Sequence, residues 1–533
     1  MPLAANRIAT LVALSLVAAW SDASDPRPNV LLCVADDWSY GHAGAYGCDW
    51  VDTPAFDRVA REGLLFRRFY TPNAKCAPSR ACLLTGRNSW QLGAAANHSA
   101  IFPPEYKGFV EALRDAGYRV GYTGKGWAPG WAETADGRPR ELTGERFADR
   151  RLDPPTKGIS ENDYAGNFSD FLEAAGSAPW CFWYGSLEPH RGYEYGSGAR
   201  LAGKTTDQID RVPGYWPDNE VVRNDLLDYA LEVQHFDEHV GRMLELLGAR
   251  GELDRTLVVV TSDHGMPFPR GKGQAYEESN HVPLAVRWPD GIEAPGRTVG
   301  GFASMIDLAP TVLEAAGVDA EETGMAAITG QSLTDRFGSA DGGEGPRGGV
   351  LIGKERHDVG RPHDEGYPIR GVVTARWLYL RNHEPDRWPA GNPEAGYPNC
   401  DASPTKTVVL DAFGQPGGSR FWELCFGKRP ADELYDLKND PDCIDNLATD
   451  AGYADVVQQL RSEMQRRLAE EGDPRMRGEG RLFDDYPYSS PATRGFYEKL
   501  TSGQAPEAPW IDAADYRPEQ NPDFEPSPAY QRP

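Results

Sequence analysis

Long apolar runs that end in polar residues restrict the fold of this chain more than any other feature. Three of them are "NVLLCVA" at 29–35, "WCFWYGSL" at 180–187 and "TLVVVTS" at 256–262. Uninterrupted runs of this length are typical of strands buried on both faces of a parallel sheet. Helical patterns alternate with such strands, and we expect helices at 106–116, 161–175, 223–249 and 306–316. This alternation predicts an α/β fold with a mostly parallel sheet flanked by helices. A further helix is expected in "DTPAFDRVAREGLLF", with Thr53 as its cap and Pro54 in its first turn.

The second half of the chain has a different pattern. A stretch rich in Gly, Asp and Glu at 317–347 precedes three strand-like segments, "GVLIGK", "IRGVVTARWLYLRN" and "ELYDL", and an amphipathic segment at 452–471. These segments predict a smaller antiparallel sheet with one helix. We therefore expect a large α/β domain at 24–345, a smaller α+β subdomain at 346–483 and a tail at 484–533 that wraps the surface.

The first 23 residues have the form of a secretory signal peptide. Arg7 precedes a short apolar run, and small residues follow at 21–23. Since no other long apolar run occurs, we expect an exported protein, periplasmic or extracellular, without a membrane span. Export permits disulfides, and of the eight cysteines we expect a pair among Cys400, Cys425 and Cys443.

The charge balance restricts the partners. With 55 basic and 80 acidic residues, the formal net charge is −25. Such an acidic surface argues against non-specific binding of nucleic acid or of an anionic membrane. An anionic substrate would need a locally positive site.

Acidic residues follow two of the buried strands. Asp36 and Asp37 come directly after the first run, and Asp263 and His264 follow the run at 256–262. Because ligands bind beyond the carboxyl ends of parallel strands, we expect these side chains to converge. Carboxylate oxygens are ligands suited to a hard divalent cation.

The stretch "NAKCAPSRACLLTGRNSW" at 73–90 predicts a helix with an unusual cysteine at its start. Pro78 suits the first turn, which places Cys76 at the helix N-terminus, and "TGR" indicates the helix end. Backbone N–H groups there favour an anion and lower the pKa of a thiol. Cys82 is expected to be a packing residue.

The same stretch resembles the signature of the type I sulfatases, Cys-x-Pro-Ser-Arg followed by Leu-Thr-Gly-Arg. "PNVLLCVADDWSYGHAGAYG", "SDHG", "YEES", "VPLAVRWP", "IDLAPTVLEAAG" and "ELYDLKNDPDCIDNLA" also occur in the order of that family. The resemblance implies an alkaline-phosphatase-like fold and hydrolysis of sulfate esters. It also implies that a maturation system oxidises Cys76 to formylglycine, whose hydrate attacks sulfur.

The family pattern implies a role for each matched residue. The metal ligands would be residue 76 with Asp36, Asp37, Asp263 and His264. The family metal is usually Ca²⁺, and the histidine nitrogen makes Mn²⁺ conceivable, with Mg²⁺ as another candidate. The catalytic set is Cys76, Arg80, Lys125, His190 and Lys272; Lys125, Lys272 and His190 would contact the sulfate ester, and Arg191 a uronate or second sulfate.

One position departs from the family pattern. The family often has a histidine two residues after the first lysine, where this chain has Trp127. That histidine is credited with helping to expel sulfate. His98 and His281 are the candidates to replace it, unless the role is dispensable.

"DHGMPFPRGKGQAY" and "PHR" resemble heparan N-sulfatases (sulfamidases) more than arylsulfatases. We therefore expect a sulfated oligosaccharide or polysaccharide as substrate, with O-sulfate and N-sulfate both open. The alternatives are a sulfohydrolase specific for N-sulfoglucosamine, a phosphodiester or phosphonate hydrolase of the same superfamily, and an inactive glycan-binding protein.

Overall fold

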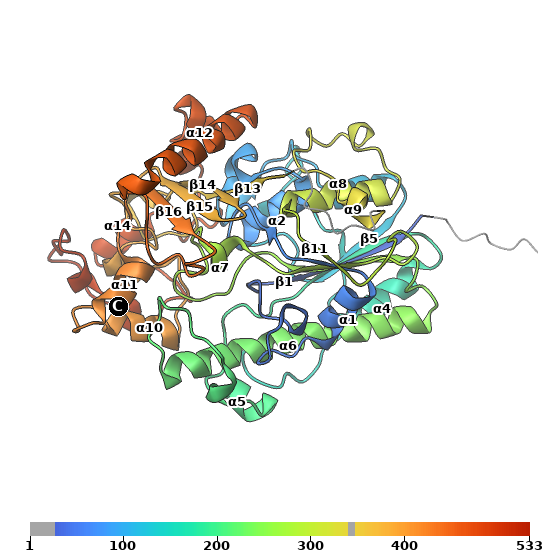
Figure 1. Ribbon diagram of the computed structural model, residues 1–533, viewed down its shortest axis with the longest axis horizontal. Helices are drawn as coiled ribbons and strands as arrows, with labels where there is room; N and C mark the ends of the chain where they lie inside the picture. The colour runs from blue at the N-terminus through green and yellow to red at the C-terminus, as the bar shows by residue number, and fades with distance from the viewer. Residues whose placement is uncertain (1–26, 339–346) are drawn as a thin grey trace, which may run out of the picture.

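The computed structural model describes residues 27–338 and 347–533, and an eight-stranded sheet forms its centre (Figure 1). The expected signal peptide lies outside the described residues, as does the expected domain boundary at 345. Seven strands run in one direction, and β10 is antiparallel to both of its neighbours. The predicted, mostly parallel sheet is therefore confirmed. Its strands, in spatial order, are β11 (Arg297–Val299), β2 (Leu64–Phe66), β10 (Leu284–Arg287), β9 (Thr256–Ser262), β1 (Asn29–Ala35), β8 (Trp180–Gly185), β5 (Arg119–Gly124) and β7 (Glu145–Arg146).

Helices cover both faces of this sheet (Figure 1). Strand β1 shows why: its residues alternate between two apolar layers, with Leu31 and Cys33 in one and Leu32 and Val34 in the other. The first layer is completed by α1 (Pro54–Glu62), α4 (Tyr164–Ala175) and α6 (Glu220–Ala249). The second is completed by α2 (Cys76–Thr85), α3 (Phe109–Asp115) and α8 (Leu308–Ala315).

The caps of the helices explain where several of them begin. Asp163 and Asn219 accept hydrogen bonds from backbone N–H groups in the first turns of α4 and α6. Pro54 is the first residue of α1, as predicted, but Thr53 makes no side-chain cap. Its hydroxyl bonds instead with Gly44 and with a carboxylate one turn later. Asp237, which lies on α6, accepts from the N–H groups of Ala55 and Phe56 at 2.8 and 2.7 Å. A residue distant in sequence therefore caps α1.

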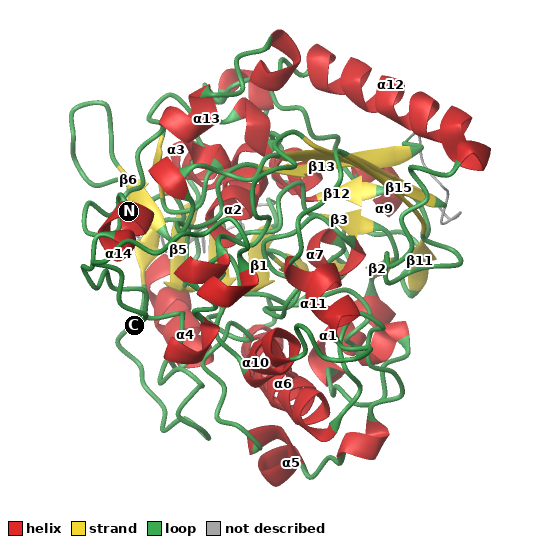
Figure 2. Cartoon of the chain, turned by 90° about the vertical axis from the view of Figure 1, so that its left-hand side faces the viewer, coloured by secondary structure: helices red, strands yellow, loops and turns green. Residues whose placement is uncertain are grey.

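A second sheet of four antiparallel strands lies beside the first. Helix α12 (Ala454–Glu470) covers one face through Leu460, Met464 and Leu468, and Figure 2 shows it above this sheet. The opposite face packs on Tyr70 and Phe302 of the larger unit. The predicted antiparallel sheet with a helix is therefore present. Its strands are β13 (Gly349–Lys354), β14 (Ile369–Thr374), β15 (Trp377–Asn382) and β16 (Asp432–Asp436).

The connection between β15 and β16 contains two helices that the sequence patterns do not predict. Helix α10 (Pro404–Asp411) packs beside α6 (Figure 2), and α11 (Ser419–Phe426) follows it. In the tail, Phe496 and Leu500 pack against Val359 and Ala395. The remaining short elements are β3 (Phe69–Tyr70), β4 (Ala100–Phe102), β6 (Gly130–Ala132), β12 (Ala303–Ser304), α5 (Ser197–Ala202), α7 (Glu277–Asn280), α9 (Thr334–Phe337), α13 (Leu482–Asp485) and α14 (Phe496–Thr501).

All eight cysteines fall within the described residues, and none forms a disulfide. The pair expected among three of them is therefore not formed. Each of these thiols is buried against a different carbonyl: Cys400 near Asp401 O, Cys425 near Tyr215 O and Cys443 near Pro441 O. Among the described helices, we find none with the length and apolar character needed to cross a membrane.

The long-range cap of α1 generates a stability prediction. Asp237→Ala leaves two buried N–H groups without an acceptor, so we expect the free energy of unfolding to fall by about 1–2 kcal/mol. Urea denaturation followed by circular dichroism measures this loss. Asp153→Ala is the control, because Asp153 is exposed and should change the free energy by less than about 0.5 kcal/mol. An equal loss in both variants would contradict the role of Asp237.

Candidate active site

The acidic residues predicted to converge follow neighbouring strands at one sheet edge. Strands β1 and β9 are parallel, and Ala35 pairs with Ser262 at their carboxyl ends. Asp36 and Asp263 therefore follow neighbouring strands at equivalent positions of the sheet edge. The Asp263 N–H donates to Ala35 O at 3.1 Å. Asp37 has a left-handed backbone with φ of 79°, which a short polar residue tolerates. This turn brings the Asp37 N–H to 3.1 Å from Asp263 Oδ1.

Helix α2 points its N-terminus at this edge. Cys76 is its first residue and Gly86, with φ of 66°, ends it, as predicted from "TGR". The whole helix is buried, with its interior face packed in the second apolar layer. Cys76 Sγ lies 3.4 Å from His264 Nε2, so the thiol and the residues after β9 share one site.

Arg80 is fully buried and joins α2 to three strand ends. Its Nε donates to Asp263 Oδ2 at 2.9 Å and its Nη2 to Asp36 Oδ1 at 3.3 Å. Its Nη1 donates to the carbonyl oxygens of Lys125 and Gly126, directly after β5. A guanidinium carries five N–H donors. One N–H of Nη2 therefore makes no hydrogen bond with a described residue.

Ligand atoms of Asp36, Cys76, Asp263 and His264 lie within 4.8 Å of one another, which makes this group a possible metal site. Asp37 adds a fifth donor, because its Oδ1 lies 2.9 Å from His264 Nε2. That oxygen is buried and pairs with the His264 ring. Asp37 also belongs to a second group of possible ligands, with His190 and Asp401. A buried carboxylate is costly unless a charged imidazole or a metal ion compensates it.

The ring of His264 has an orientation that suits a cation. Its Nδ1 lies 3.0 Å from the carbonyl oxygen of Gly265, so the Nδ1–H donates there and Nε2 presents its lone pair. Burial opposes charge on this ring, but Asp263 and Asp37 outweigh it and hold the pKa of His264 well above its usual range. A proton and a divalent cation therefore compete for Nε2. The donor set fits a divalent cation.

Two lysines flank this group, and each is held by a carboxylate. Lys125 follows β5 and donates to Asp36 Oδ2 at 2.6 Å. Lys272 donates to Asp37 Oδ2 at 2.8 Å and to Asp401 Oδ2 at 2.7 Å. Asp401 belongs to the segment between β15 and α10, and sequence reasoning misses it. No local pattern marks it, apart from its position shortly before the helix cap Ser403.

These opposite charges shift the pKa values in the site. Burial opposes ionisation of Asp36 and Asp37, but Lys125 next to the first and Lys272 next to the second hold both pKa values below the usual range. Burial and Asp36 also oppose ionisation of Cys76. Lys125 and His264 outweigh them, so the pKa of the Cys76 thiol lies well below its usual value. The site therefore stabilises an anion at position 76.

His190 and Arg191 follow β8 and have different partners. His190 Nε2 lies 2.9 Å from Lys272 Nζ, and its Nδ1 lies 3.2 Å from Arg191 O. His190 is thus placed beside the predicted sulfate-binding lysine. The Arg191 guanidinium forms a buried, bidentate ion pair with Asp225 instead, and its Nε donates to Pro267 O. The structure therefore provides an internal partner for the predicted substrate ligand Arg191.

The position that departs from the family pattern supports α2. Trp127 Nε1 donates to Ala77 O in the first turn of that helix at 2.9 Å. Of the two candidate histidines, His281 uses both ring nitrogens, on Glu277 and on Arg67 O. His98 Nδ1 lies 3.0 Å from Asp358 Oδ1, whereas its Nε2 has no hydrogen-bond partner among the described residues.

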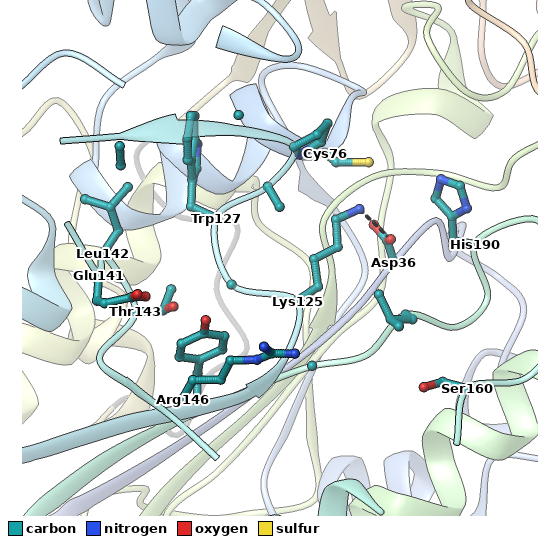
Figure 3. A pocket seen from close by; sticks show the side chains of 18 of the residues that line it. Asp36, Cys76, Lys125, Trp127, Glu141, Leu142, Thr143, Arg146, Ser160 and His190 are labelled. Atoms are coloured by element: carbon teal, nitrogen blue, oxygen red, sulfur yellow. Dashed lines mark hydrogen bonds and ion pairs between the residues drawn. The ribbon is translucent and has the colours of Figure 1, made fainter. Parts of the chain in front are cut away.

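A cavity of about 1110 Å³ opens onto Cys76. Figure 3 shows Cys76, Lys125, Asp36 and His190 close together, while Arg146 extends into another part of the cavity. His98, Trp127 and Arg191 also line it. Every residue predicted for the site except Arg191 thus lies in one contiguous group with its polar atoms directed at its neighbours. The functional role of each stays a prediction.

Comparison with known proteins gives the family. The model of the sulfatase family, described as "Sulfatase", matches residues 28–318. Human N-sulphoglucosamine sulphohydrolase is 28% identical over 84% of this chain and 91% of its own length. An ulvan-active sulfatase of Formosa agariphila is 26% identical over 84% of this chain and 76% of its own. A structure solved with its substrate D-glucosamine-2-N,6-O-disulfate is 22% identical and superimposes with a TM-score of 0.56, covering 84% and 98% of the two chains.

The matched region contains every predicted metal ligand and every predicted catalytic residue. Asp401, which the structure adds to the site, lies outside it. The chain belongs to the sulfatase family and is a sulfuric ester hydrolase. The predicted family membership is therefore confirmed.

The position of Asp37 beside His264 generates a prediction that is independent of turnover. Ca²⁺ at 100 times its dissociation constant should raise the free energy of unfolding by about 2.7 kcal/mol, and Asp37→Ala should abolish most of this gain. Because a cation must displace the proton from His264, binding should weaken as the pH falls. Thermal unfolding with Ca²⁺, Mn²⁺ or chelator measures the effect. Asp153→Asn is the comparison, because Asp153 is exposed and belongs to neither group of possible ligands. No shift in the parent protein with any of these ions would contradict the metal site.

Proposed function

We propose that this chain hydrolyses the sulfate group of a sulfated carbohydrate, with residue 76 as the nucleophile. One observation carries the proposal. The intact "CAPSR" sequence begins a buried helix whose first residue meets a group of metal-type ligands at the end of a large cavity. A lone helix N-terminus would bind an anion only weakly; the lysines and donor group around it make a site suited to a sulfate ester.

The proposal requires that Cys76 is oxidised to formylglycine by a maturation system. The hydrated aldehyde supplies a geminal diol, one hydroxyl to attack sulfur and one to release sulfate. The role of this chain is to hold that group in place. The remaining N–H of Arg80 and the electropositive surroundings that favour an anion at position 76 support such an orientation.

The cation proposed for the site is Ca²⁺, with Mn²⁺ or Mg²⁺ as candidates. Its ligands would be Asp36, Asp37, Asp263 and His264 together with residue 76. Four of the five are oxygen ligands once position 76 is hydrated, which favours a hard cation, and the single imidazole nitrogen is what makes Mn²⁺ conceivable. A bound divalent cation supplies Lewis acidity toward a sulfate oxygen.

Lys125 and Lys272 are proposed to bind the sulfate group. An ammonium has three N–H donors, and Lys125 uses one on Asp36, so two remain for substrate oxygens. Lys272 is directed at Asp37, Asp401 and His190. We assign His190 the proton that the leaving oxygen or nitrogen takes up, because its Nε2 lies beside Lys272, the proposed sulfate-binding lysine. Solvent in the cavity that His190 lines would restore that proton.

The relatives guide the substrate class. Their names refer to N-sulphoglucosamine and to ulvan, so a sulfated oligosaccharide or polysaccharide is the proposed substrate. Both an N-sulfate and an O-sulfate fit the same lysines. Specific hydrolysis of N-sulfoglucosamine is therefore the narrower alternative, favoured by the first of these relatives.

Two other functions are weaker. A phosphodiester or phosphonate hydrolase of the superfamily would normally carry Thr or Ser where this chain has Cys76. An inactive glycan-binding protein is favoured only by Trp127, whose indole N–H supports the first turn of α2. We also propose export to the periplasm or the medium. This rests on the signal-like sequence at 1–23.

The proposed nucleophile generates a direct test. Protein expressed with its maturation system should release sulfate from heparin-type or algal sulfated oligosaccharides, and Cys76→Ala should abolish release. Mass spectrometry of the tryptic peptide with residue 76 should show an aldehyde in the active protein. Cys82→Ala is the matched control, because Cys82 lies on the same helix and packs in the apolar layer. An unmodified thiol at position 76 in active protein would contradict the assignment of the nucleophile.

His98 is the proposed substitute for the histidine missing at position 127. It lines the cavity, and the buried Asp358 orients its ring. His98→Gln should lower kcat about 100-fold, because the step that frees sulfate loses its proton acceptor. Rapid-mixing kinetics should still show a first burst of the alcohol product. His363→Gln, at an exposed histidine, is the control. An unchanged kcat in His98→Gln would contradict this role of His98 and would indicate that water accepts the proton.

A further inference from the structure

The cavity extends well beyond the group that binds sulfate. Its volume of about 1110 Å³ exceeds the roughly 300–1000 Å³ that holds a drug-sized ligand. Trp131, Arg146 and Lys157 line it on segments other than those that carry the metal ligands. We propose that these three residues, the outer subsite, bind a second and acidic sugar unit of a sulfated oligosaccharide, with its acid group on Arg146. This inference rests on the proposed function and names its substrate more closely.

Strand pairing fixes where Arg146 lies. Arg146 of β7 is paired with Tyr122 of β5, so both side chains emerge on the same face, and both line the cavity. Lys125 lies three residues after Tyr122, a distance of about 10 Å along an extended strand. In Figure 3 the Arg146 guanidinium extends toward the lower end of Lys125, while the Lys125 ammonium lies at Asp36. Arg146 is therefore placed for a group of the ligand other than the one on Lys125.

Arg146 forms no ion pair with a described residue, unlike two other arginines of the cavity. Arg140 forms an ion pair with Glu111, and Arg191 forms one with Asp225. The side chains of Arg146 and Lys157 form no hydrogen bond or ion pair with any described residue, and both are exposed. An arginine fork binds a carboxylate or a sulfate bidentately. Because Arg191 has an internal partner, Arg146 and Lys157 are the cations available for the second acid group, and Arg146 has the fork that binds it bidentately.

The other groups of the outer subsite suit a sugar ring. Trp131 is 54% exposed at the cavity rim, although large aromatic side chains are usually buried. An exposed indole presents an apolar face with a polar edge, on which a sugar ring can stack. Glu141 and Glu161 line the same cavity and can accept hydrogen bonds from sugar hydroxyls. These two carboxylates balance the charges of Arg146 and Lys157. The position of Arg146, rather than the net charge of the cavity, therefore determines where the acid group of the ligand binds.

The test compares three disaccharides that carry the same cleavable sulfate. In the first, the neighbouring unit bears a carboxylate; in the second, that carboxylate is reduced to an alcohol; in the third, a sulfate ester replaces it. We expect kcat/KM of the parent enzyme to be at least about tenfold higher for an acidic disaccharide than for the reduced one. In Arg146→Gln this ratio should fall close to one. Trp131→Ala should lower kcat/KM for all three disaccharides alike.

Binding is measured in parallel, so that the result does not depend on turnover. In the Cys76→Ala background, titration calorimetry should give the same tenfold ratio of dissociation constants, and Arg146→Gln should remove it. Arg481→Gln is the matched control, because Arg481 is exposed and does not line the cavity.

The turnover and binding results distinguish failure of the outer subsite from failure of the proposed function. A ratio near one in the parent protein, or a ratio unchanged by Arg146→Gln, would overturn the outer subsite while sulfate release still supports the function. Absence of sulfate release from every substrate would overturn the function, and the dissociation constants would still decide the subsite. The acid that gives the larger ratio, carboxylate or sulfate, identifies the group on Arg146.

Discussion

The buried guanidinium of Arg80 is the interaction on which the whole site depends. It links the first helical turn after Cys76 to carboxylates after β1 and β9, and to carbonyls after β5. A fully buried guanidinium is tolerated only where charged and polar partners surround it, because its desolvation is costly. The three strand ends and the helix must therefore be assembled together. Position 76 is placed by the sheet as a whole rather than by its own helix.

The site is built from compensating charges within an acidic protein. The chain has a formal net charge of −25, yet it concentrates Arg80, Lys125 and Lys272 at one sheet edge. Each of these cations has a buried carboxylate partner, which keeps it charged and fixes its position. Under the proposed function, an anionic substrate would meet cations that are already desolvated and oriented, and such preorganisation favours a transition state with charge on sulfate oxygens.

The sequence predicts most of this arrangement because its signals are local. Buried parallel strands are long apolar runs, and Asp36 and Asp263 follow two of them directly. Cys76 begins a helix that a proline and a glycine delimit. Asp237 and Asp401 escape prediction for the opposite reason: each acts on a segment far away in the chain, the latter 129 residues from Lys272. A single aspartate without a surrounding pattern gives no sign of such a partner, which depends on tertiary packing.

The contact between Asp401 and Lys272 has a consequence for how this molecule can be divided. The apolar layers of the larger α/β unit include Phe337 and, from the connection between β15 and β16, residues from Trp388 to Phe426, whereas the family model matches only up to residue 318. Yet one carboxylate that fixes a lysine of the site comes from the connection between β15 and β16. That connection, which packs in the first apolar layer of the larger unit, therefore contributes a carboxylate beside the proposed site. Changes in its loops would reach the proposed reaction centre without touching any residue of the sulfatase motif.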